Sequence, residues 1–167
     1  MAQPQVEEAH IAGENPLDRA LRLSLAKARA VAQRYPDAIV IGSDQVAAIG
    51  DSVLDKPGDA PTCTAQLAAL SGKTAKFYTG CAVIRSSTRL ELTHVDTTSV
   101  VFRAFTNAEV NRYVAAEQPF DCAGGFKVES LGISLFERVE SEDPTALIGL
   151  PLIWLAAAFR KAGFAVP

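Results

Sequence analysis

The sequence predicts an α/β protein in which a mixed, twisted sheet carries flanking helices, built as a single domain over residues 1–167. Helix-like and strand-like segments alternate along the chain, which is the pattern of α/β folds. The middle of the chain is rich in Val, Thr, Phe and Tyr and contains one turn signal, which is typical of an antiparallel hairpin or meander. A chain of 167 residues can bury a core of its own, and no repeat or linker divides it.

Four helices are predicted from capping residues and apolar spacing. The first begins with Asn15 as N-cap and Pro16 as its first residue, and Pro36 stops it. Its apolar stripe is expected to consist of Leu17, Leu21, Leu25, Ala28 and Val31 or Ala32. The other helices are expected from Asp59 to before Gly72, from a capping box at Thr106–Glu109 to about Glu117, and from near Pro151 to before Gly163.

The strands are predicted from apolar runs and turn residues. Ala38–Ile41 is a short apolar run, ended by Gly42–Asp44, and is typical of a buried strand that delivers polar residues at its carboxyl end. Residues 75–105 predict a hairpin or meander with its turn at Ser86–Ser87. Residues 120–140 are expected to alternate short strands with glycine turns.

Composition argues against several classes of protein. The formal net charge is −3 and no basic run occurs, so a nucleic-acid-binding surface is not expected. Three cysteines without a C-x-x-C pair predict neither a disulfide framework nor a zinc site, and fit a reducing cytoplasm. The longest apolar stretch, Leu147–Phe159, is too short to cross roughly 30 Å of hydrocarbon, and the first twelve residues lack the apolar core of a signal peptide.

Two motifs of other enzyme classes are incomplete. Gly72–Thr74 resembles the end of a phosphate-binding P-loop, but Leu67 stands where that motif requires glycine, and the segment follows a predicted helix. His10 and His94 have no second histidine or cysteine nearby, so they predict no metal site. No G-x-S-x-G sequence is present, and covalent hydrolase chemistry therefore has no support.

Three charged residues are candidates for chemistry. Asp44 follows the predicted buried strand, and ligands of open α/β sheets bind beyond the carboxyl ends of strands. An acid there can hold a divalent metal or orient a water molecule, or it can simply cap the next turn. Lys27 and Lys56 can contact phosphate or remain solvated, and residue type alone leaves both readings open.

A series of short motifs, taken in order, resembles the Maf family of nucleotide pyrophosphatases. The motifs span nearly the whole chain. Ser-Asp-Gln-Val at 43–46, Phe-Tyr-Thr-Gly at 77–80 and Phe-Lys-Val-Glu at 126–129 are similar to the branch that acts on 7-methyl-GTP. The full set of matching segments is 4–8, 23–28, 41–46, 55–57, 70–72, 77–80, 122–129 and 149–152.

The resemblance implies cleavage of a nucleoside triphosphate between its α and β phosphates. Asp44 would activate water or hold the metal, and Glu8 would help to bind it; Mg²⁺, Mn²⁺ or Co²⁺ is the expected cofactor. Lys27 and Lys56 would neutralise the phosphates. Gln45 and Glu129 match positions that select the base, and a carboxylate at Glu129 can accept both guanine N–H groups. Phe126 is suggested as the aromatic that stacks on the base.

One departure from the family opens two other readings. Family members begin with a strand, a Ser-x-Ser-Pro-x-Arg-Arg loop and a helix, about thirty residues comparable to one β-α unit, and this sequence begins after that unit. The loop supplies a serine and an arginine to the triphosphate. The alternatives are a pyrophosphatase for dTTP, UTP or CTP and a non-catalytic, truncated regulator of cell division. A small-molecule nucleotide is the expected partner, and the resemblance allows a homodimer.

Overall fold

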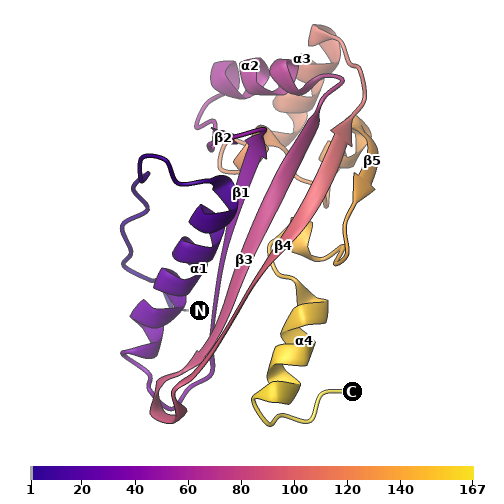
Figure 1. Ribbon diagram of the computed structural model, residues 1–167. Helices are drawn as coiled ribbons and strands as arrows, with labels where there is room; N and C mark the ends of the chain where they lie inside the picture. Colours follow the sequence, from indigo (N-terminus) through magenta and orange to yellow (C-terminus); the bar gives the residue numbers. More distant parts are fainter. Residues whose placement is uncertain (1) are drawn as a thin grey trace.

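The computed structural model describes residues 2–167 and contains a five-stranded sheet with the strand order β2-β1-β3-β4-β5 (Figure 1). Each pair of neighbouring strands is antiparallel. The long β3–β4 hairpin forms the middle of the sheet, and its turn contains a short 3₁₀ helix, as the Ser86–Ser87 signal predicted. The strands are β1 Val40–Ile49, β2 Ser52–Leu54, β3 Thr74–Arg85, β4 Leu90–Phe102 and β5 Phe136–Glu140.

The four predicted helices are present, and the predicted N-terminal caps of the first three are confirmed. The Asn15 side chain accepts a hydrogen bond of 2.8 Å from the Asp18 amide, and Asp59 caps the second helix in the same way. Thr106 and Glu109 form a complete capping box. Within the part of the chain that the structure describes, no helix combines the length and apolar character of a membrane-spanning segment. The helices are α1 Pro16–Ala32, α2 Ala60–Leu70, α3 Asn107–Glu117 and α4 Leu152–Lys161.

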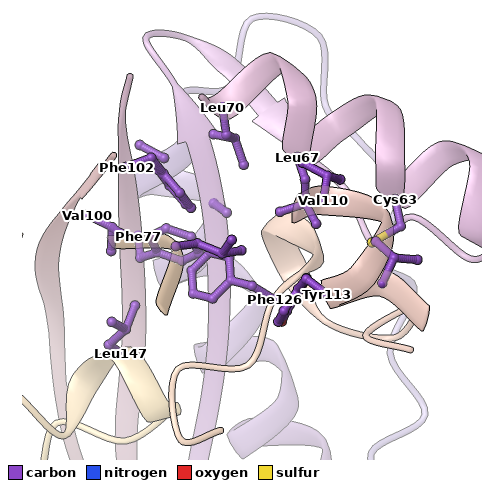
Figure 2. Close-up of a cluster of buried hydrophobic side chains, with 14 residues drawn as sticks. Cys63, Leu67, Leu70, Phe77, Val100, Phe102, Val110, Tyr113, Phe126 and Leu147 are labelled. Carbon is purple, nitrogen blue, oxygen red and sulfur yellow. The ribbon is translucent and has the colours of Figure 1, made fainter. Parts of the chain in front are cut away.

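The helices lie on both faces of the sheet (Figure 1). Successive residues of β3 point to opposite faces, so Ala82 and Ile84 pack against α1 while Cys81 and Val83 pack against α4. Nearer the other end of the sheet, on the face that α4 also covers, α2 and α3 enclose the largest core cluster. Figure 2 shows Phe77, Phe102 and Val100 of the sheet facing side chains of these two helices.

The predicted α/β class with flanking helices is confirmed, but the strand pairing is not mixed. All strands found within residues 2–167 are joined in antiparallel pairs, and hairpins link β1 to β2 and β3 to β4. The first strand is also longer than expected. It continues through Gly42 to Ile49, which puts Asp44 in the middle of β1, opposite Gly80 of β3, and not beyond the end of a strand.

Gly42 belongs to a close contact between helix and sheet, which explains why it does not end the strand. A Cβ atom at Gly42 would lie 2.5 Å from the Ser24 carbonyl oxygen, and one at Gly80 would lie 2.3 Å from the Ala20 carbonyl oxygen. Side chains at these positions would push α1 off the sheet. The buried face of α1 is accordingly made mostly of small residues, and the predicted stripe is wrong in part, because Leu17 is exposed.

Residues 120–140 also differ from the prediction. Instead of alternating short strands, the segment forms two 3₁₀ turns, Ala123–Gly125 and Leu131–Leu135, followed by β5 alone. Gly124 and Gly125 have φ angles of 76° and 73°, in the left-handed region that glycine adopts readily. These turns place Phe126 inside the core cluster, beside Phe77 and Phe102 (Figure 2). Its ring makes edge contacts with Phe77, Phe102 and Phe136.

Candidate active site

Beside β1 and beneath α1 lies a cavity of about 320 Å³, within the usual size range of small-ligand sites. Four of the predicted site residues with ionisable side chains line it. Glu8 comes from the segment before α1, Lys27 from α1, Asp44 from β1 and Lys56 from the segment after β2. The remaining lining residues are Arg19, Leu23, Gln45, Val46, Ala47, Val53, Leu54, Asp55 and Ala123.

Lys27 joins the two carboxylates predicted to hold a metal. Its Nζ lies 2.6 Å from Asp44 Oδ1 and 2.7 Å from Glu8 Oε1. The Asp44 side chain is only 11% exposed, whereas that of Glu8 is 54% exposed. One carboxylate is therefore held away from water under α1, and the other reaches it from a solvent-facing segment.

The surroundings shift the pKa values of Asp44, Glu8 and Lys27 in different directions. Burial raises the pKa of Asp44, although its hydrogen bond to Lys27 opposes that rise. The hydrogen bond to Lys27 lowers the pKa of Glu8. Burial works against the charge of Lys27, but the hydrogen bonds that Lys27 donates to Asp44 and Glu8, together with the charges of these carboxylates, outweigh it, so the pKa of Lys27 is raised. Asp44 is thus the carboxylate with the stronger tendency to take up a proton.

The segment before α1 is held in place by Arg22 of that helix and by Arg34 in the turn that follows it. Arg22 bonds through two nitrogens to the Glu14 carboxylate, at 2.5 and 2.7 Å, and donates to the Ala9 carbonyl at 3.2 Å. Arg34 donates to the Gln3 carbonyl at 2.9 Å. These contacts bracket Glu8 in the chain and fix the segment that brings its carboxylate to Lys27.

Gln45 lines the same cavity, but its side chain also makes hydrogen bonds within the protein. Its side-chain Nε2 donates to Thr79 Oγ1 at 2.9 Å and to the carbonyls of Ala146 and Leu147, both at 3.1 Å. Thr79 donates to the same Ala146 carbonyl. Gln45 therefore ties the loop before α4 to the sheet, and its predicted role in choosing the base stays a prediction.

Glu129 and Phe126 are not among the residues that line the cavity. Glu129 is exposed, in the turn between the two 3₁₀ segments, and is not among the lining residues, so its role as base reader also stays a prediction. Burial is the main cause that raises the pKa of Cys122, and the charge of Glu129 adds to it. Cys122 is the residue before Ala123, which lines the cavity. The suggestion that Phe126 stacks on a base is wrong, because the residue is only 5% exposed and its ring is packed among three other phenylalanines.

Two charged residues of the cavity were missed in the sequence. Arg19 and Lys27 are eight residues apart with Leu23 between them, so all three lie on one helical face and point to the same cavity. That spacing was available from the sequence. Asp55 also lines the cavity, and it had been noted only as part of a motif with Lys56.

The two carboxylates suit a metal that a substrate helps to bind. Within residues 2–167, no cluster of three or more Asp, Glu, His or Cys side chains is placed to hold an ion alone. Magnesium commonly takes only one or two carboxylates from the protein and completes its shell with water and substrate phosphates. Glu8 and Asp44, on either side of Lys27, fit that kind of site.

A largely buried carboxylate among cations, in a cavity of this size, defines a site for an anionic substrate. The family model described as "Maf-like protein" matches residues 1–162. The chain therefore belongs to the Maf family.

Its relatives include proteins named 7-methyl-GTP pyrophosphatase. The protein of Xanthomonas oryzae pv. oryzae (strain MAFF 311018) is 51% identical over 165 residues, which cover 99% of this chain and 86% of that protein. That of Xanthomonas axonopodis pv. citri (strain 306) is 48% identical with the same coverage. That of Hahella chejuensis (strain KCTC 2396) is 46% identical over 152 residues, 91% of this chain and 76% of its own length.

Proposed function

We propose that this protein hydrolyses 7-methyl-GTP to 7-methyl-GMP and pyrophosphate. The observation that carries the proposal is the Lys27-bridged pair of Asp44 and Glu8 in a cavity that also presents Arg19 and Lys56. It occurs in a chain that is about half identical, over nearly its whole length, to proteins named for this activity.

Asp44 is the group suited to take the proton of the attacking water. The water oxygen bonds to a phosphorus atom of the α–β anhydride, the bond from that phosphorus to the bridging oxygen breaks, and the water proton passes to Asp44. A general base works best when its pKa is near the working pH. Burial raises the pKa of Asp44 toward that range, and the hydrogen bond and charge of Lys27 oppose the rise.

The negative charge of the triphosphate would be neutralised by lysine side chains and by a divalent metal ion. Lys27 and Lys56 lie on the cavity wall, where their charges can face phosphate oxygens. Glu8 and Asp44 would hold a divalent ion such as Mg²⁺, Mn²⁺ or Co²⁺, which when bound would neutralise further charge on the phosphates. Lys27 positions both carboxylates for that purpose through its two short hydrogen bonds.

The product distinguishes this function from its alternatives. The wild-type protein with Mg²⁺, Mn²⁺ or Co²⁺ should release pyrophosphate and 7-methyl-GMP, with kcat/KM higher for 7-methyl-GTP than for dTTP, UTP or CTP. Anion-exchange chromatography of the products, together with a coupled pyrophosphate assay, measures both. Higher kcat/KM on a pyrimidine triphosphate would reassign the substrate, successive release of orthophosphate would contradict α–β cleavage, and no turnover of any triphosphate would favour the regulatory reading.

Base choice is expected to depend on Glu129. The change Glu129→Gln replaces one acceptor by a donor, which would face a donor of guanine, so kcat/KM for 7-methyl-GTP should fall by about tenfold or more, given ~1.5–3 kcal/mol per charge-assisted hydrogen bond. The loss on UTP or dTTP should be smaller. Kinetics on both substrates, with the exposed Glu137→Gln as the matched control, tests this. Equal losses on both substrates would indicate a folding defect, and no loss would remove Glu129 from recognition.

We also place the protein in the cytoplasm. Its three cysteines are free thiols, and Cys63 and Cys81 are buried. Burial raises their pKa values, to about 11 for Cys63 and about 12 for Cys81. Such thiols are unreactive, which suits a reducing compartment.

A further inference from the structure

Arg19 is a largely buried cation of the cavity, and the reaction steps described above give it no role. It lies in the second turn of α1, and its side chain is 12% exposed. Its NH1 group lies 2.8 and 2.9 Å from the two ring nitrogens of His10, and 3.8 Å from Asp55 Oδ1. Both neighbours are exposed, with side-chain exposures of 58% for His10 and 64% for Asp55.

The hydrogen-bonding capacity of Arg19 is not used up by these neighbours. Its Nε–H is buried and has no acceptor within residues 2–167. Buried donors in proteins are almost always paired, so this unpaired one leaves Arg19 with hydrogen-bonding capacity that its neighbours do not use. A guanidinium presents its donors as a planar fork, which matches two oxygens of one phosphate.

The distribution of charge in the cavity points to the same partner. Lys27 is held by two carboxylates at 2.6 and 2.7 Å, whereas the nearest carboxylate of Arg19 is at 3.8 Å and on the surface. Exposed ion pairs of that kind are weak. Arg19 is thus the more available of the two cations that α1 contributes, and an incoming polyphosphate can displace Asp55 at little cost.

We propose that Arg19 is a phosphate-binding residue of this site, which exchanges its contacts with the exposed side chains of Asp55 and His10 for oxygens of the substrate's polyphosphate chain. The proposal rests on the proposed function and deepens it by naming the guanidinium that receives the substrate. Arg19 binds the phosphates in the ground state and in the transition state alike, so it contributes to affinity more than to the chemical step.

The test compares two arginines of the same helix. Arg19→Gln should weaken the binding of inorganic tripolyphosphate, measured by titration calorimetry without nucleotide, by about tenfold or more, as expected for the loss of a charge-assisted contact. In turnover assays it should raise KM by a similar factor and leave kcat within a few fold. Arg29→Gln is the matched control, because Arg29 pairs with Glu91 outside this cavity, and it should bind tripolyphosphate like the wild type.

The remaining outcomes separate this inference from the proposed function. Arg19→Lys, which keeps the charge but loses the fork, should lie between the wild type and Arg19→Gln. Wild-type affinity in Arg19→Gln would overturn the inference alone, and so would a loss of kcat at constant KM. If the wild type bound neither tripolyphosphate nor any nucleoside triphosphate, the proposed function would fall as well.

Discussion

Asp44→Asn is expected to lower kcat by about a hundredfold or more, the range associated with loss of a general base, while the protein stays folded. The change preserves the shape of the side chain, and the amide oxygen can still accept the hydrogen bond that Lys27 donates at 2.6 Å. What it removes is the ability to take a proton and the negative charge that a metal would require. Because Asp44 lies in the middle of β1 and its side chain is 11% exposed, little else should change around it.

The measurement is steady-state turnover of 7-methyl-GTP, accompanied by thermal unfolding of the same preparation. Asp37→Asn provides the control, since Asp37 is exposed and lies just before β1; its turnover should equal that of the wild type. Turnover of Asp44→Asn within a few fold of wild type would remove Asp44 from the mechanism. A large fall in its unfolding temperature would make the loss of activity a matter of stability.

The helices could be predicted from the sequence because their ends are local. Asn15, Asp59 and Thr106 each accept a hydrogen bond from a backbone amide three residues later, which their spacing to the next apolar run reveals. The turn of the β3–β4 hairpin is local in the same sense. These elements appear where they were expected.

The strand that carries Asp44 could not be predicted correctly, because the role of Gly42 depends on its contact with α1, which lies elsewhere in the sequence. Gly42 looks like the end of a strand when only its neighbours are considered. In the structure it is the point where α1 passes over the sheet, with the Ser24 carbonyl where a side chain would be. The same packing explains the buried stripe of α1, in which small residues replace the expected leucines.

The site residues came chiefly from the family resemblance, and the structure brings most of them together. No local sequence pattern identifies Glu8, because its position depends on Arg34, which holds the backbone before it, and on Arg22, which holds the backbone after it. Residue type alone did not decide whether Asp44 and Lys27 belong to the site. The 2.6 Å contact between them joins residues that are 17 positions apart in the sequence, so local patterns do not reveal it. Arg19 could have been found from its eight-residue spacing to Lys27 along a helix.

Lys27→Met is expected to produce a comparable loss of activity near neutral pH, for an electrostatic reason. The change keeps most of the side-chain length but leaves the Asp44 carboxylate, largely buried, without its cation and still near Glu8. Burial already raises the pKa of Asp44, and the hydrogen bond and charge of Lys27 oppose that rise. Without Lys27 the pKa should rise further, so more of the base is protonated at a given pH.

The pH dependence of kcat/KM therefore identifies the role of Lys27. Since the base must be deprotonated, the acid limb of the profile should move to higher pH in Lys27→Met, and raising the pH should recover part of the lost activity. The variant should also lose more stability, relative to wild type, at about pH 8 than at about pH 5, because Lys27 stabilises the ionised form of Asp44, whose pKa is raised by burial and which takes up a proton as the pH falls. Lys161→Met, an exposed change in the last turn of α4, should leave both profiles unchanged. A loss of activity that is the same at every pH would mean that Lys27 contacts phosphate without tuning Asp44.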